Sequence, residues 1–217
     1  MEVFGKQKIF CIGMSKTGTT SLKKAFQDLG YRVGSETAVY PFYQNYAVRD
    51  FKPLIEHCKT AQVFEDELFG LPYTFQALDS AFPGSKFILT VRDDEKRWYD
   101  SFINHHIRKF GKNGHLPTSE ENETFFKAEG LNRLEYMRIR FDAPADDLFN
   151  EEILKEAYLE HNKTVCDYFR YRDQDLLVIN LSDKKSYHRF CNFIDRKPIY
   201  EKFPHLNKGS DITGSRR

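Results

Sequence analysis

The sequence predicts an α/β fold of three layers, with a central, mainly parallel sheet flanked by helices. Strand-like and helix-like patterns alternate along the 217 residues with short connections, which favours parallel strands joined by helices. After its first residue, the run "KIFCIG" at 8–13 is continuously apolar, as in a strand buried on both faces. Apolar residues at helical spacing follow at 19–29 and stop at Gly30, a residue type that commonly ends helices.

The remaining elements are expected in alternating order along the chain. Further strands are predicted at 31–33, at the start of 61–67, at 86–91 and at 175–181. Further helices are predicted at 50–58, 73–82, 93–110, 151–171 and 186–194. The segment 111–150 is less regular, and a stretch of this length in a compact domain is typical of a lid or a binding element. The length and the 40% hydrophobic content favour a single domain over 1–217.

Composition and charge argue against several classes of protein. The net charge is +1, from 33 basic and 32 acidic residues, so no overall field favours nucleic acid or an anionic membrane as a partner. No apolar stretch approaches the roughly 18 residues of a membrane span, and the N-terminus has no secretory leader pattern. The four cysteines are scattered without a C-x-x-C spacing, which favours a reduced, cytoplasmic protein with buried thiols. None of these features determines the oligomeric state.

The turn between the first strand and the first helix has the glycine spacing of a phosphate-binding P-loop. Gly13 and Gly18 match the two glycines of a Walker A loop, but Thr19 stands where that loop has its lysine. The lysine inside this loop is Lys16, two residues before the second glycine. Backbone N–H groups and the helix dipole at such a turn attract an anion without that lysine. The turn therefore suits one terminal phosphate-like group better than a triphosphate with Mg²⁺, and hydroxyl donors are available at Thr17, Thr19, Thr20 and Ser21.

This loop resembles that of the sulfotransferases that use 3′-phosphoadenosine 5′-phosphosulfate (PAPS). Their phosphosulfate loop has the form [PS]-K-[ST]-G-T-[TS], and this chain carries Ser15-Lys16-Thr17-Gly18-Thr19-Thr20. The resemblance implies a P-loop-type α/β fold, PAPS as the donor, and a sulfuryl group transferred in line to an acceptor hydroxyl or amine. It also implies that Lys16 stabilises the charge that grows on the bridging oxygen of the donor.

A second match to this family lies in "KFILTVRDDEKRWYDSF". The family binds the 3′-phosphate with an arginine at the end of a strand and a serine on the helix that follows, which correspond to Arg92 and Ser101. Arginine offers a planar donor fork for phosphate, and the carboxyl ends of parallel strands are where ligands of such sheets bind. Ser101 lies one residue further along than is usual in the family, which rotates it by about 100° on the helix. Either a local adjustment restores it, or Arg97 or another group shares the phosphate.

A third match lies near the C-terminus. The stretch "CNFIDRKPIYEKFPHLNK" is similar to the ending of some bacterial and fungal sulfotransferase-like proteins. The resemblance implies that Asn207 or Lys208 closes over the nucleotide. A loosely ordered terminus is the alternative.

An acceptor hydroxyl must lose its proton as it attacks, so a general base is expected near Lys16. Asp66, at the carboxyl end of the predicted strand at 61–67, is the first candidate. Glu36, in a loop after the predicted strand at 31–33, is the second, and Glu65 is the third. If strand alternation holds, Glu65 and Asp66 point to opposite faces of the sheet and only one of them enters the cleft.

The acceptor is expected to be a small molecule or a carbohydrate, held by the loops at 35–50 and 111–150. The aromatic residues between Tyr40 and Tyr46 either line an acceptor pocket or pack on the sheet. The pair His105-His106 lacks metal-ligand spacing, so we predict no metal site and expect both residues on a helix surface. The alternatives are a P-loop small-molecule kinase, which the absence of lysine at position 19 argues against, and a nucleotide-binding protein without catalysis.

Overall fold

Four parallel strands form the central sheet of the computed structural model, which describes residues 6–118, 133–204 and 206. In spatial order the strands are β2 (Val63–Glu65), β1 (Ile9–Cys11), β3 (Lys86–Thr90) and β4 (Leu176–Ile179). Every pairing is parallel, with Phe10 opposite Phe64 on one side and Phe87 on the other. The strand expected at 31–33 is reduced to a single bridge between Val33 and Val63.

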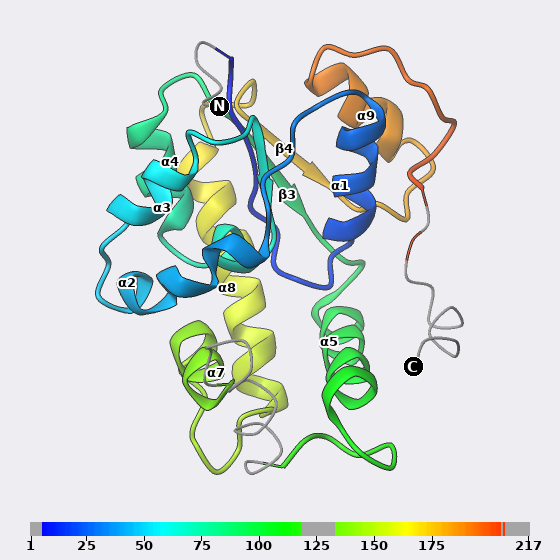
Figure 1. The fold of residues 1–217 in the computed structure, drawn as a ribbon. Helices are drawn as coiled ribbons and strands as arrows, with labels where there is room; N and C mark the ends of the chain where they lie inside the picture. The colour runs from blue at the N-terminus through cyan, green and yellow to red at the C-terminus, as the bar shows by residue number, and fades with distance from the viewer. Residues whose placement is uncertain (1–5, 119–132, 205, 207–217) are drawn as a thin grey trace.

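Helices cover both faces of this sheet, which confirms the predicted three-layer α/β architecture. One face carries α1 (Thr19–Asp28) and α9 (Ser186–Phe193), and the other carries α3 (Lys52–His57), α4 (Thr74–Ala81) and α8 (Glu151–Phe169) (Figure 1). A hydrophobic core lies on each face of the sheet, and successive residues of β1 point alternately into one core and then the other. Phe10 packs with the α8 side, whereas Ile9 and Cys11 pack with α1 and α9. Burial on both faces explains why the strands are apolar without alternation.

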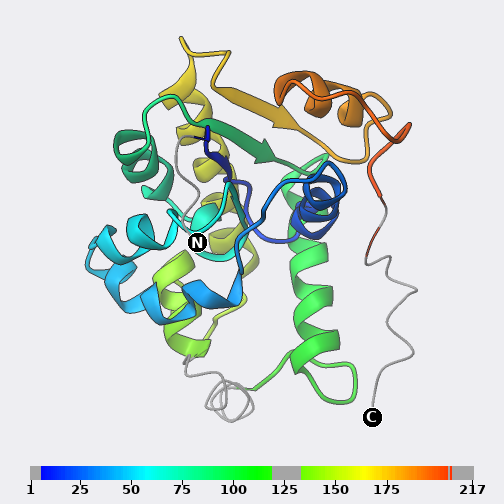
Figure 2. The ribbon, with the colours of Figure 1, turned by 45° about the horizontal axis from the view of Figure 1, so that its top comes forward.

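Helix α5 (Glu95–Phe110) extends away from the carboxyl edge of the sheet, where it borders the loop after β1 (Figure 2). Its start is fixed by Asp94, whose carboxylate accepts a 2.6 Å hydrogen bond from the backbone N–H of Arg97. Asn150 caps α8 in the same way through the N–H of Ile153. The carboxyl edge thereby gains a long helix with cationic residues in its last turn.

The described part of the segment 111–150 that follows residue 132 is more regular than its sequence suggests. Helix α7 (Arg133–Phe141) forms there and buries Tyr136, Met137 and Phe141 against the α8 side of the core. Arg138 and Arg140 lie among its apolar residues and obscured the helical pattern in the sequence. Shorter elements complete the fold: η1 (Thr37–Phe42), α2 (Tyr43–Ala47) and η2 (Glu67–Gly70). No helix within the described residues is long and apolar enough to cross a membrane.

Candidate functional site

The loop between β1 and α1 is held in a compact turn by its own backbone. Lys16 and Gly18 have positive φ angles of 73° and 107°, and Gly18 begins α1. Gly13 is required by close approach, since a Cβ atom there would lie 2.1 Å from Oγ1 of Thr90 at the end of β3. At the start of a helix, the first N–H groups have no partner within the helix and carry the positive end of its dipole. The turn therefore presents donors toward the carboxyl edge of the sheet.

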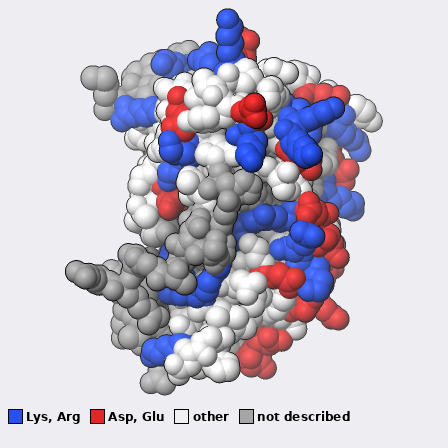
Figure 3. All heavy atoms as spheres, turned by 90° about the vertical axis from the view of Figure 1, so that its right-hand side faces the viewer, with Lys and Arg blue, Asp and Glu red and all other residues white. Residues whose placement is uncertain are grey.

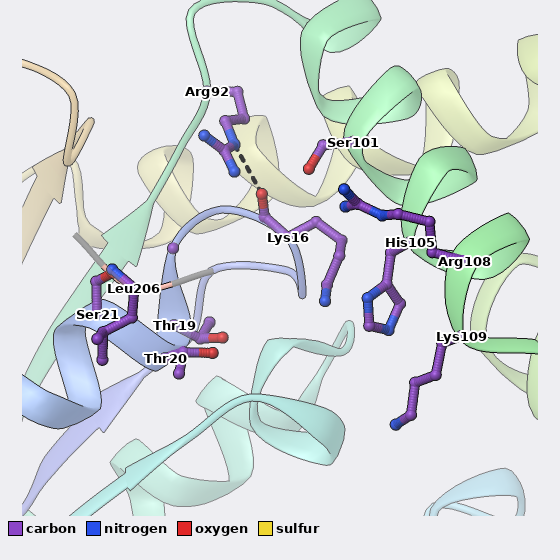
Figure 4. Close-up of a pocket in the computed structure, with 11 residues that line it drawn as sticks. Lys16, Thr19, Thr20, Ser21, Arg92, Ser101, His105, Arg108, Lys109 and Leu206 are labelled. Atoms are coloured by element: carbon purple, nitrogen blue, oxygen red, sulfur yellow. Dashed lines mark hydrogen bonds between the residues drawn. The ribbon is translucent and has the colours of Figure 1, made fainter. Parts of the chain in front are cut away.

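The loop's own Thr17 and side chains from the end of β3 and from α5 anchor this turn. Thr17 donates a 2.6 Å hydrogen bond to the carbonyl of Met14, and its hydroxyl lies 2.5 Å from that of Thr90. The Trp98 indole donates to the carbonyl of Ser15 at 3.0 Å. Arg92 Nε donates to the carbonyl of Lys16 at 2.7 Å. These contacts hold the loop from β3 and α5, and the Lys16 side chain extends from the loop toward His105 on α5 (Figure 4).

A cavity of about 250 Å³ opens beside this loop, and we call it the basic cavity. Its lining comes from the loop, α1, the end of β3, α5 and the C-terminal segment: Lys16, Gly18, Thr19, Thr20, Ser21, Arg92, Ser101, His105, Arg108, Lys109 and Leu206 (Figure 4). Among the described residues that line it there are four cationic side chains and no carboxylate. On the face of the molecule in Figure 3, Lys and Arg lie in the middle and along the upper part, and Asp and Glu are most frequent along the lower right edge.

The neighbouring positive charges affect the pKa of Lys16. Burial lowers its pKa below the usual range; Asp66 opposes the shift, whereas Lys109 and Arg140 add to it. An anion in the basic cavity would relieve the repulsion between Lys16 and Lys109, because opposite charges favour the charged form of a lysine. The arrangement is therefore suited to binding anionic groups.

Four cavity residues were not anticipated from the sequence: Leu206 near the C-terminus and three residues on α5. His105, Arg108 and Lys109 line the basic cavity beside Ser101, one and two turns further along α5. Residues four and seven or eight apart share one face of a helix, so the spacing from Ser101 was a usable signal. The expectation that both histidines lie on the helix surface is wrong. His106 is only 3% exposed, with Nδ1 2.7 Å from the carbonyl of Phe102, because neighbouring residues on a helix diverge by about 100°.

A family profile described as a sulfotransferase domain matches residues 8–212, nearly the whole chain. The chain belongs to the sulfotransferase family. Membership makes it a transferase of sulfuryl groups and agrees with the fold and with the loop at 15–20. No curated protein sequence matched the chain.

Most of the residues predicted to bind the donor of this sulfotransferase meet in the basic cavity. Lys16, Gly18, Thr19, Thr20, Ser21, Arg92 and Ser101 all line it. Ser101 reaches it despite the longer interval from Arg92. Arg97, the alternative, is an exposed residue that pairs with Asp93 at 3.3 Å and lies outside the lining. The side chains of Ser15 and Thr17 are buried and bond within the protein, so only their backbone groups remain for a ligand on the cavity side.

The C-terminal segment of the sulfotransferase packs against α1 and α9. Phe203 is buried between Tyr187 and Phe190, with ring centroids 5.2 Å from each. Beyond it, the N–H of Leu206 donates a 3.3 Å hydrogen bond to Ser21 Oγ at the basic cavity. Asn207 and Lys208 lie outside the described residues. The chain thus arrives at the cavity just before these two positions.

The three candidate bases of this sulfotransferase form one carboxylate cluster. Oxygen atoms of Glu36, Glu65 and Asp66 lie within 4.8 Å of one another. Lys23 Nζ joins them, at 3.1 Å from Glu36 and 3.2 Å from Glu65. The strand alternation that would point Glu65 and Asp66 to opposite faces does not hold, because β2 ends at Glu65 and the φ of Asp66 is 62°. Strand alternation applies only while the backbone stays extended.

Within the cluster, Asp66 stands closest to the donor loop. Its Oδ2 accepts a 2.9 Å hydrogen bond from Thr19, a residue of the basic cavity. Glu65 is 3% exposed; burial and then the neighbouring Asp66 raise its pKa to about 8, although Lys23 opposes the shift. Asp66 is thus partly exposed and Glu65 is buried, although they are adjacent in the chain.

Two of the aromatic residues expected near the acceptor, Tyr43 and Tyr46, are buried in the core on the α8 side of the sheet. Tyr43 is buried and donates a 2.6 Å hydrogen bond to Glu67 Oε2, while its ring lies 5.2 Å from that of Tyr136. Tyr46 borders a second hollow of about 650 Å³ between α2 and α7, together with Arg49 and Arg138. Packing in the core therefore accounts for both rings: Tyr46 is 3% exposed and its hydroxyl donates a 3.1 Å hydrogen bond to the carbonyl of Pro72, although it also borders the hollow.

Proposed function

We propose that this sulfotransferase takes its sulfuryl group from PAPS and transfers it to a hydroxyl or amine of a small-molecule or carbohydrate acceptor. The observation that carries the proposal is the basic cavity, where four cationic side chains meet a P-loop turn without a carboxylate among the described lining residues. PAPS has anionic groups at its 3′ and 5′ positions, and the cavity offers donors at both of its ends.

The residues present fit such a nucleotide. The loop from Ser15 to Thr20, with Ser21, would hold the 5′-phosphosulfate through backbone N–H groups and hydroxyls. Arg92 and Ser101 would hold the 3′-phosphate, with Arg108 and Lys109 contributing charge. Lys208 would close the site from the C-terminal segment, which reaches Ser21 at Leu206. No metal is required, because the cationic side chains supply the positive charge.

When bound, PAPS would supply a sulfuryl group that leaves its bridging oxygen as the acceptor attacks. Lys16 would place its ammonium beside that oxygen and stabilise the negative charge that develops there. Asp66 would take the proton from the acceptor, since it accepts from Thr19 at the edge of the basic cavity. Glu36 and Glu65 remain alternative bases, with Lys23 between them. The loops at 35–50 and 111–150 would bind the acceptor within a single domain.

The four cysteines support a cytoplasmic setting for this reaction. All are free thiols, and Cys11, Cys58 and Cys191 are buried. Free thiols persist in reducing compartments.

Calorimetric titration without metal tests the donor. We expect 3′-phosphoadenosine 5′-phosphate (PAP), the product of the donor, to bind wild-type protein more tightly than ATP does. Arg92→Ala should weaken PAP binding, because it removes the guanidinium from the cavity. A preference for ATP with Mg²⁺ would support the kinase alternative instead. Tight PAP binding without turnover of PAPS against an acceptor panel would support a non-catalytic nucleotide-binding protein.

A further inference from the structure

Arg140 lies in the protein interior next to the donor loop, although nothing in the proposed reaction uses it. It is 3% exposed and belongs to α7, which packs against α2 and α8. Its guanidinium Nη2 donates a 2.7 Å hydrogen bond to Ser15 Oγ, and Nη1 donates to the Tyr136 hydroxyl. The guanidinium also lies 5.3 Å from the centre of the Phe141 ring. A charged side chain is rarely buried so completely unless specific partners hold it.

Ser15 is therefore hydrogen-bonded by side chains of two helices that are far apart in the sequence. Trp98 on α5 bonds to its carbonyl, and Arg140 on α7 bonds to its hydroxyl. The next residue is Lys16, whose φ of 73° is unusual for a residue with a long side chain. Such a conformation persists only where the surroundings enforce it. The two hydrogen bonds to Ser15 and the hydrogen bond from Arg92 to the Lys16 carbonyl hold the backbone of Lys16 in this conformation.

Arg140 also belongs to the electrostatic surroundings of Lys16. The groups facing Lys16 are Asp66 and Glu67 after β2, Lys109 on α5 and Arg140 on α7. Burial alone would lower the pKa of Arg140, but Tyr136, Tyr43 and Glu67 raise it above the usual range, so the guanidinium stays charged. Arg140 is thus a permanent positive charge near Lys16 that stands outside the basic cavity.

We infer that Arg140 is a positioning residue for Lys16, acting from the protein interior through Ser15. It would tie the donor loop to α7 and, through the Tyr136 and Tyr43 pair, to Glu67 beside the carboxylate cluster. Its consequence for catalysis rests on the proposed function; its effect on the loop and on Lys16 does not.

Two measurements on the full chain test this role. Competitive acetylation with acetic anhydride, followed by mass spectrometry, gives the pH midpoint of Lys16 reactivity without any nucleotide. Calorimetry gives the affinity for PAP. The variants are Arg140→Met, Arg140→Lys and Tyr136→Phe, the last keeping the bond between Arg140 and Ser15. Lys96, exposed on α5, serves as the internal control for the labelling.

In Arg140→Met we expect the Lys16 midpoint to rise, because a positive neighbour is lost, and PAP affinity to fall about 10- to 100-fold. Arg140→Lys should restore the midpoint, and Tyr136→Phe should resemble wild type in both measurements. If Arg140→Met lowers the melting temperature but changes neither the Lys16 midpoint nor the PAP affinity, the role of Arg140 is structural and the inference is overturned.

The role of Arg140 can still be decided if the wild-type protein binds no PAP or if Arg140→Met does not fold. If wild-type protein binds no PAP, the proposed function fails, while the Lys16 midpoints still decide the role of Arg140. If Arg140→Met does not fold, Ser15→Ala removes only the accepting hydroxyl. Because Arg140 keeps its charge in Ser15→Ala, we expect the pH midpoint of Lys16 to stay near the wild-type value. We expect Lys16 to be labelled faster and PAP to bind more weakly, because the loop is less firmly held, and wild-type values for both would overturn the inference.

Discussion

The side chain of Arg92 donates through Nε to the backbone carbonyl of Lys16 at 2.7 Å. One residue at the end of β3 therefore shapes the donor loop and also faces the basic cavity. The backbone N–H of Arg92 is itself fixed by the Tyr158 hydroxyl at 2.9 Å, so this corner is anchored to α8.

Arg92→Lys should keep the charge and lose the loop contact, because an ammonium cannot donate along both directions of a guanidinium. We expect PAP affinity to fall about tenfold, the effect of about 1.4 kcal/mol in binding. Calorimetry at constant salt measures it. Arg97→Lys, at an exposed position outside the cavity, is the matched control and should bind like wild type. Equal loss in both variants would contradict the role of Arg92.

Lys16→Ala should lower turnover of PAPS by about two to three orders of magnitude, the usual scale for losing one preorganised group that stabilises developing charge. The measurement is PAP release with an acceptor identified by screening. Lys24→Ala, on the adjoining helix but outside the cavity lining, is the control. Near-normal turnover in Lys16→Ala would rule out the proposed role.

Asp66→Asn should lower turnover about 10²- to 10⁴-fold while leaving PAP affinity nearly unchanged, because a general base acts on the acceptor. Glu36→Gln is the comparison within the same cluster, and we expect a smaller loss there. The reverse ranking would make Glu36 the base. A loss of PAP binding in Asp66→Asn would show that Asp66 supports the loop through Thr19 instead.

His161 should make stability depend on pH. Its Nε2 lies 2.7 Å from the carbonyl of Ile12, and burial lowers its pKa to about 4 despite that hydrogen bond. A histidine in the unfolded chain titrates near pH 6.5. Between about pH 6.5 and 4, His161 is therefore protonated in the unfolded chain and neutral in the folded protein. Stability from this group is therefore complete above that window and decreases as the pH falls through it.

Urea unfolding at about pH 7 and about pH 5 measures the effect, which we expect to be about 2 kcal/mol for this one group. His161→Gln does not titrate, so its loss of stability between the two pH values should be smaller by that amount. An identical loss in both proteins would contradict a buried neutral His161.

The sequence by itself determined the features that depend on local chemistry. The glycine spacing and Lys16 predicted the loop, and continuous apolar runs predicted the buried strands, because a strand covered on both faces has no polar side. The end of the strand at 86–91 also placed Arg92 correctly at the carboxyl edge. Each of these follows from neighbouring residues alone.

Only the tertiary structure decided how distant segments meet. The turn at Asp66 breaks strand alternation and gathers Glu65 and Asp66 into one cluster, which a two-residue period cannot predict. Arg140 lies 125 residues from Ser15 along the chain, yet it bonds to the donor loop. Its helix was missed because a buried cation carries no apolar signal. Burial of such a group becomes possible only when partners from separate elements converge on it.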